Sequence, residues 1–87
     1  MKTFRLIVSS PNGNVYEGET FMLTLRGVAG DLAILAGHIP FTTAVVPCDC
    51  KIELPNGEIK IGRLDSGILS VGMEETTLLT GNFTFKE

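Results

Sequence analysis

The chain has 87 residues, of which 44% are hydrophobic and 20% are charged, and its formal net charge is −3. This length leaves room for one domain, and the apolar content is high enough to form its core. The seven basic residues are scattered along the sequence, which argues against a partner that is nucleic acid or an anionic membrane. No stretch has the roughly 20 apolar residues of a transmembrane helix or the apolar core of a signal peptide. We therefore expect a single domain over residues 1–87 that stays in the compartment where it is made.

Apolar residues alternate with a period of two along the whole sequence, which is typical of β-strands that place one face on a core. In chain order the predicted inward-facing groups are Phe4, Leu6 and Val8; Phe21, Leu23 and Leu25; Phe41, Thr43 and Val45; Cys50, Ile52 and Leu54; Ile59 and Ile61; Leu69, Val71 and Met73; and Phe83 and Phe85. Turn-forming residues separate these groups, most clearly Asn56-Gly57, which suits the positive φ angles of a tight hairpin. The pattern predicts an all-β fold, a two-layer antiparallel β-sandwich of about ten short strands.

Residues 32–36 read Leu-Ala-Ile-Leu-Ala and break the alternation, because every position is apolar. One interpretation is a strand buried on both faces within the sandwich. The other is that one of its faces meets a second protein. The positive mean hydropathy of so small a domain supports some contact of that kind, because a limited interior leaves apolar surface outside.

The candidate reactive side chains predict no catalytic or metal site. His38 is the only histidine and stands among turn residues, so we interpret it as a turn residue whose ring hydrogen-bonds the local backbone. Cys48 and Cys50 project to the same side of a strand, and we interpret both as small apolar core residues, with an oxidation-sensitive thiol at Cys48 as the alternative. We expect solvated charges at Asp49 and at Glu74-Glu75. No phosphate-binding loop is present, so we expect no cofactor.

Residues 28–47, VAGDLAILAGHIPFTTAVVP, resemble the signature region of the epsilon subunit of bacterial F-type ATP synthases. That region typically has Gly with an acidic residue, a short apolar strand, Pro-Gly-His, and a Leu/Thr-Ala-rich strand that ends at Pro. The matching positions are Gly30-Asp31, Leu32 to Leu35, Gly37-His38, Pro40, Thr43-Ala44 and Pro47. Residues 4–19 resemble the first hairpin of the family and residues 63–71 a later strand pair, so the resemblance covers nearly the whole chain.

The sequence departs from the family at several positions. Ala33 and Ala36 stand where the family usually has Gly and Pro, and Ala36 makes its loop less rigid because Pro fixes φ. Asp65 stands where an apolar residue is common, and Cys48 where Gly often follows Pro. Family members typically continue into a two-helix hairpin that has no counterpart in these 87 residues. We therefore expect the inhibitory, ATP-responsive role of that hairpin not to carry over.

The resemblance implies a non-catalytic subunit of the central stalk. The sandwich would bind the gamma subunit with one face and the rotor c-ring with a lower loop, and so couple proton transport to ATP synthesis. It would be a peripheral part of the complex at the cytoplasmic face of the bacterial inner membrane, without inserting into it. For the ring contact the resemblance indicates an exposed loop from Gly30 to Phe41, with Asp31 and His38 at the surface and Leu35, Ile39 and Phe41 as further contacts.

The alternative function is that of a freestanding β-sandwich recognition module that binds a peptide or a sugar. Such modules normally present exposed aromatic residues as a binding platform. This sequence has no Trp and one Tyr, Tyr16, so its composition favours the structural subunit.

Overall fold

The computed structural model of the chain describes residues 2–86, which form ten strands and no helix in that range. The strands are β1 (Phe4–Ser10), β2 (Gly13–Thr20), β3 (Met22–Gly27), β4 (Gly30–Leu35), β5 (Phe41–Val45), β6 (Cys48–Glu53), β7 (Ile59–Leu64), β8 (Gly67–Val71), β9 (Glu75–Thr80) and β10 (Phe83–Phe85). They make one hydrogen-bonded sheet in the order β10-β7-β6-β3-β5-β8-β9-β1-β2, with β4 added beside β3. The predicted all-β architecture is confirmed. This part of the chain contains no helix able to cross a membrane.

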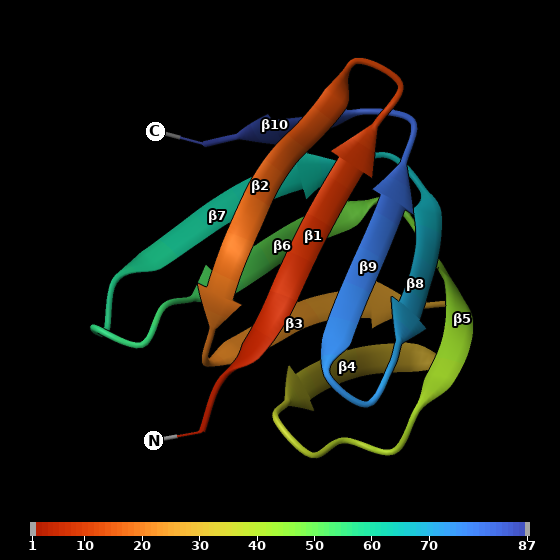
Figure 1. Cartoon of the computed structure of the whole chain (residues 1–87). Coiled ribbons are helices and arrows are strands. Elements are labelled where there is room, and N and C mark those ends of the chain that lie inside the picture. Colours follow the sequence, from red (N-terminus) through yellow and green to blue (C-terminus); the bar gives the residue numbers. More distant parts are fainter. Residues whose placement is uncertain (1, 87) are drawn as a thin grey trace.

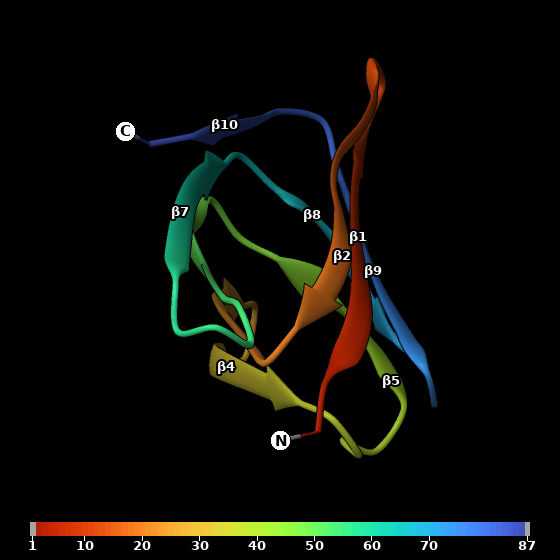
Figure 2. The same ribbon diagram turned by 60° about the vertical axis from the view of Figure 1, so that its left-hand side comes forward.

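The sheet folds over on itself into two layers (Figure 1, Figure 2). One layer contains β1, β2, β8 and β9, and the other contains β3, β6, β7 and β10. β5 connects the layers, because it pairs with β8 along its length and with the end of β3 at Val45. The arrangement is therefore a sandwich that is nearly closed into a barrel.

One pair of strands departs from the predicted antiparallel arrangement. β1 and β9 run parallel, with Arg5 opposite Glu75 and Ser9 opposite Leu79, whereas the other strand pairs are antiparallel. The β8–β9 hairpin lies between β5 and β1, so a strand near the end of the sequence adjoins the first strand. A parallel pair is not joined by a tight turn, so no turn motif in the sequence indicates it.

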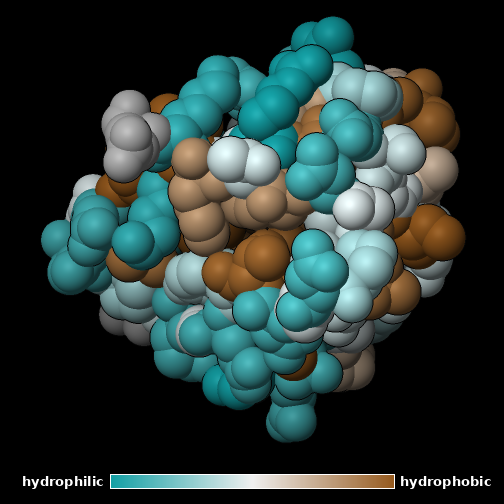
Figure 3. Space-filling model, turned by 90° about the horizontal axis from the view of Figure 1, so that it is seen from above, coloured by the Kyte–Doolittle hydropathy of each residue, from teal (hydrophilic) through white to brown (hydrophobic). Residues whose placement is uncertain are grey.

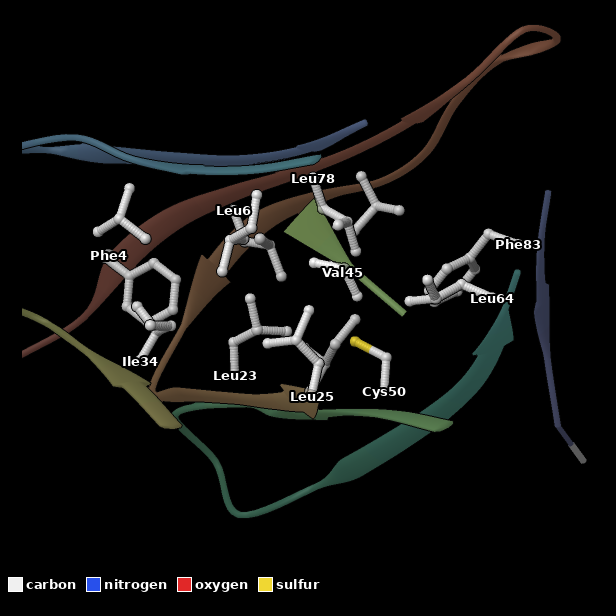
Figure 4. Packing of buried hydrophobic residues seen from close by; sticks show 14 residues of the cluster. Phe4, Leu6, Leu23, Leu25, Ile34, Val45, Cys50, Leu64, Leu78 and Phe83 are labelled. Atoms are coloured by element: carbon white, nitrogen blue, oxygen red, sulfur yellow. The ribbon is translucent and has the colours of Figure 1, made fainter. Parts of the chain in front are cut away.

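Side chains from both layers meet in one core (Figure 4). Leu6 and Leu78 come from one layer, and Leu23, Leu25 and Cys50 come from the other. The buried hydrophobic residues are Phe4, Leu6, Val8, Leu23, Leu25, Ile34, Val45, Cys50, Ile52, Leu64, Leu69, Val71, Leu78 and Phe83. Each fully buried aliphatic side chain contributes roughly 1.5–3 kcal/mol through the hydrophobic effect, so this cluster is the main source of stability. Most of the predicted inward-facing groups are thereby confirmed.

On β7 the predicted inward face is wrong. Ile59 and Ile61 point outward and are 49% and 39% exposed. The antiparallel register with β6 decides this, because it places Gly62 and Leu64 over the core. The ring of Phe83 fills the space above Gly62, so that a Cβ at this position would overlap the ring. The two isoleucines therefore lie on the solvent side of the sheet.

Two other predicted core positions lie at the surface. Met73 is 82% exposed because β8 ends two residues earlier and Met73 belongs to the turn that follows. Phe85 is 36% exposed at the rim, where its ring contacts that of Phe83 edge-on at a centroid distance of 5.0 Å. Phe41 and Leu54 are half-buried and pack against the core. Met73 and Phe85 are exposed because they stand at or beyond the end of a strand, where the core no longer covers a full face.

Residues 32–36 do not form a strand buried on both faces, so that prediction is wrong. β4 lies at an edge of the sheet and, within the described range, pairs only with β3. Ile34 is 1% exposed and faces the core, whereas Ala33 and Leu35 face outward. An edge strand of a two-layer fold has a core on one side only, which is why half of this apolar strand is exposed. Contact of the outward side with another protein remains a prediction.

The β6–β7 hairpin turns at Asn56-Gly57, as predicted, but only Gly57 has a positive φ. The Leu54 N–H donates to the Glu58 carbonyl oxygen at 2.8 Å and closes the hairpin. The Asn56 side-chain oxygen accepts the Glu58 N–H at 2.9 Å. Asn56 therefore contributes through its side chain rather than through a left-handed backbone.

Candidate functional site

The segment predicted as one exposed loop from Gly30 to Phe41 is a strand followed by a shorter loop. β4 occupies its first half, and residues 36–40 lead to β5. The turn after β4 is closed by Gly37, whose φ is 85°, and by the His38 N–H, which donates to the Leu35 carbonyl oxygen at 3.2 Å. β4 and residues 36–40 together form the lower edge of the molecule (Figure 1). We call this surface the lower edge.

Asp31 begins the lower edge and is held by an ion pair. It lies opposite Arg26 on β3, and the Arg26 Nε is 2.8 Å from the Asp31 Oδ1. This hydrogen bond, followed by the attraction between the two charges, raises the pKa of Arg26. The Asp31 side chain is 72% exposed, so the carboxylate is accessible to a partner although it is already paired.

His38 lies in the loop beyond β4 and contacts its own surroundings. The ring Nδ1 donates to the Ile39 carbonyl oxygen at 2.8 Å, and the ring centroid is 5.1 Å from that of Phe41. The interpretation of His38 as a turn residue with a local backbone hydrogen bond is confirmed. The residue is nevertheless exposed, so the same ring also presents a surface outward.

The structure does not bring Asp31 and His38 together, because they lie at opposite ends of β4. The extended stretch from Asp31 to Leu35 alone spans roughly 13 Å at the usual rise per residue. The large exposed side chains near them are apolar. Leu35 lies between Asp31 and His38 and is 41% exposed, Ile39 follows His38 and is 78% exposed, and Val28 precedes β4 and is 66% exposed. The lower edge is therefore a long, mostly apolar surface with a polar group near each end.

Of the further contacts indicated by the resemblance, Leu35 and Ile39 are exposed and Phe41 is half-buried against the core. Val28, at the tip of the β3–β4 turn, was not singled out. A valine at a turn position, where Gly, Asn, Asp, Pro or Ser is usual, is the signal in the sequence that could have indicated it.

A second surface covers the outward side of β5 and β8 and the adjoining parts of β1 and β9, next to the charged pair of Arg5 and Glu75. Its side chains form two uncharged rows across the four strands, which are Ser9, Leu79, Ile68 and Ala44 in one and Ile7, Thr77, Ser70 and Thr42 in the other. Ile68 and Leu79 are 51% and 52% exposed and lie opposite each other. A shallow hollow of about 430 Å³ adjoins them beside the β1–β2 turn. We call this surface the uncharged face.

No motif in the sequence indicates the uncharged face. Ile68 and Leu79 are isolated apolar residues at the outward positions of their strands, so each alone carries little signal. Only the pairing of β8 with β9 brings them side by side. Hydrophobic residues also reach the surface in several separate groups when the molecule is seen from above (Figure 3).

The two cysteines project to the same side of β6, as predicted. Cys50 is fully buried, and this burial, followed by the nearby Cys48, raises the pKa of its thiol to about 12. Cys48 is half-buried at the rim, where its Sγ accepts the Arg26 N–H at 3.4 Å. It also lines an open hollow of about 370 Å³ with Arg26, Asp49 and Arg63. The core interpretation is confirmed for Cys50, and oxidation of Cys48 stays a prediction.

The carboxylates are solvated, as expected. Asp49 is exposed, with the Lys86 Nζ 2.8 Å and the Arg63 Nη1 3.5 Å away. The hydrogen bond from Lys86 is the main reason why the pKa of Asp49 lies below its usual value. Glu74 and Glu75 are also exposed, at the β8–β9 turn. In residues 2–86 no three His, Cys, Asp or Glu side chains gather in a way that would hold a metal ion.

The only tyrosine does not provide an aromatic platform. Tyr16 packs against the core, and its hydroxyl lies 3.4 Å from the Glu19 carbonyl oxygen and from the Thr20 Oγ1. This placement gives no support to a module that binds a peptide or a sugar through stacked aromatic rings.

These features define a small β-sandwich domain with two exposed surfaces, one mostly apolar and one uncharged. The family model described as ATP synthase, Delta/Epsilon chain, beta-sandwich domain matches residues 3–86, and the chain belongs to this family. The resemblance stated from the sequence is confirmed. This family is that of a non-catalytic subunit, so the chain is not an enzyme in its own right.

Proteins similar to this chain in sequence include several ATP synthase epsilon chains. That of Clostridium perfringens strain 13 is 33% identical over 87 residues, which are 100% of this chain and 65% of the relative. The ATP synthase epsilon chain, sodium ion specific, of Acetobacterium woodii is 37% identical over 79 residues, which are 91% of this chain and 59% of the relative. The chain thus spans somewhat less than two thirds of the length of these relatives.

Two solved structures have the same fold. A chain of the Euglena gracilis mitochondrial ATP synthase structure of OSCP, F1 and c-ring aligns with a TM-score of 0.90 at 16% identity, covering 95% of this chain and 53% of that one. A chain of the Tetrahymena thermophila mitochondrial ATP synthase central stalk and c-ring aligns with a TM-score of 0.76 at 14% identity, covering 94% and 66%. At such low identity these alignments establish the fold alone.

Proposed function

We propose that this domain is the β-sandwich part of an ATP synthase epsilon subunit in the central stalk. It binds gamma and the rotor c-ring and thereby couples proton transport to ATP synthesis at the cytoplasmic face of a bacterial inner membrane. The observation that carries the proposal is the family match over residues 3–86, which coincides with relatives that are named epsilon chains. One of those relatives is named as sodium ion specific, so a test of coupling has to measure the transport of both protons and sodium ions.

For the c-ring we propose the lower edge. Leu35 and Ile39 are exposed there without a partner strand or layer in the described range to cover them, and burial of such side chains against a second protein is favourable. Asp31 and His38 add a polar group near each end, which fixes orientation and register more than affinity. A contact that uses both must extend along the whole of β4.

For gamma we propose the uncharged face. It has two large exposed aliphatic side chains, Ile68 and Leu79, set among small residues, so a partner can approach the sheet closely. Its two rows contain no charge that would have to be desolvated on binding. β5 begins directly after the loop of residues 36–40, so the two proposed contacts adjoin.

To test both proposals, we compare three double variants in the assembled enzyme by subunit binding and by ion transport per ATP hydrolysed. Asp31→Ala with His38→Ala should leave the subunit bound but lower ion transport per ATP hydrolysed. Ile68→Asp with Leu79→Asp should release the subunit from the complex. Ile59→Asp with Ile61→Asp is the matched control, because these residues are exposed on the other layer, and it should change neither measurement.

Folding is checked on the isolated domain in parallel. Asp31→Ala with His38→Ala should shift the melting temperature by no more than about 3 °C. The two aspartate pairs should lower it further, because they place like charges close together on strands, so binding is compared per folded molecule. If Asp31→Ala with His38→Ala lowers the melting temperature strongly while transport per folded complex stays normal, the two residues support the turn and the ring contact lies elsewhere. If Ile68→Asp with Leu79→Asp leaves the subunit bound, the uncharged face is not the gamma contact.

A further inference from the structure

We draw no further inference here: the strongest candidate, the open hollow between β3, β6 and β7 lined by Arg26, Cys48, Asp49 and Arg63, rests on a single half-buried thiol whose neighbouring arginines are already paired with Asp31 and Asp49, and nothing else in the structure points to a ligand there.

Discussion

Cys48 and Cys50 stand two positions apart on β6 but lie in different environments. The thiolate is the form of cysteine that alkylating reagents attack. Burial raises the pKa of the Cys50 thiol to about 12, so at pH 8 almost none of it is thiolate, and its sulfur is also out of reach of solvent. Cys48 is half-buried beside an open hollow and is accessible. The difference between the two follows from depth in the sandwich, not from the sequence spacing.

We therefore predict that iodoacetamide modifies Cys48 alone in the native domain at pH 8. Mass spectrometry should show one added group per folded chain and two after unfolding in urea. A Cys48→Ser variant should react only when unfolded. A Cys50→Ser variant should gain one group while it is still folded. Modification at Cys50 under native conditions would contradict the buried position of this residue.

Gly62 is required by a close approach rather than by an unusual backbone angle. Its φ is not positive, and the ring of Phe83 occupies the space where a Cβ would lie. We predict that Gly62→Ala destabilises the domain by about 1–3 kcal/mol, because overpacking forces the ring or the strand to move. Gly81→Ala is the matched control, since a Cβ at Gly81 meets no atom within 4 Å, and it should change stability by about 0.5 kcal/mol or less. Urea unfolding measures both.

The cause is tested by combining Gly62→Ala with Phe83→Leu. If the clash with the ring is the source of the cost, Gly62→Ala should cost less in the Phe83→Leu background than alone. An equal cost in both backgrounds would place the effect in the β7 backbone instead.

At the level of elements, β4 shows how an edge strand divides an apolar run. Ile34 is 1% exposed and Leu35 is 41% exposed, although they are adjacent aliphatic residues on one strand. We predict that Ile34→Ala lowers the free energy of unfolding by about 2–4 kcal/mol through the loss of buried contacts. Leu35→Ala should lower it by less than about 1 kcal/mol, because half of that side chain is in solvent. Chemical denaturation measures the free energy of unfolding of both variants. Equal losses of this free energy would mean that β4 is covered on both sides.

The sequence predicted the existence of the strands better than the faces of some of them. Alternation identified Leu6, Leu23 and Ile52 as core residues, most clearly Ile52, because its neighbours Lys51 and Glu53 mark the opposite face. It failed at Ile59 and Ile61. The inward-facing residue next to Ile61 is Gly62, which has no side chain to show which face is buried. For residues 32–36 the apolar run gives no face at all, and only the position of β4 at the sheet edge decides it.

The candidate site was predictable in its residues but not in its geometry. The motif that contains Asp31 and His38 indicated an exposed segment, and both residues are exposed. Their separation follows from β4, which the apolar run indicated as a strand, whereas the resemblance indicated a single loop from Gly30 to Phe41. The uncharged face depends on pairing between strands that are distant in sequence, such as β1 with β9, and single residues carry no trace of such pairing.

On the scale of the whole molecule, the pairing of β1 with β9 joins the beginning of the chain to its later part. Together with β5, which bridges the two layers, it makes one continuous sheet whose edge strands are β2, β4 and β10. The proposed coupling role requires the two proposed contact surfaces to keep a fixed relation, which one continuous sheet supports. The lower edge and the uncharged face are both built on strands of this one sheet, so we expect force applied at one to reach the other.

The same architecture leads to a prediction about regulation. The inhibitory, ATP-responsive role implied by the resemblance belongs to a helical hairpin, and residues 2–86 form a wholly β body with extents of 30 × 28 × 22 Å. We predict that the 87-residue polypeptide, added to a catalytic sector that lacks its own epsilon subunit, binds without slowing ATP hydrolysis. The hydrolysis rate is measured with and without the polypeptide over a range of ATP concentrations, with binding followed by co-purification. A full-length epsilon chain that contains the hairpin is the positive control, and the Ile68→Asp with Leu79→Asp variant is the control for binding. Strong inhibition by the bound polypeptide that high ATP relieves would show that the sandwich itself carries the inhibitory function.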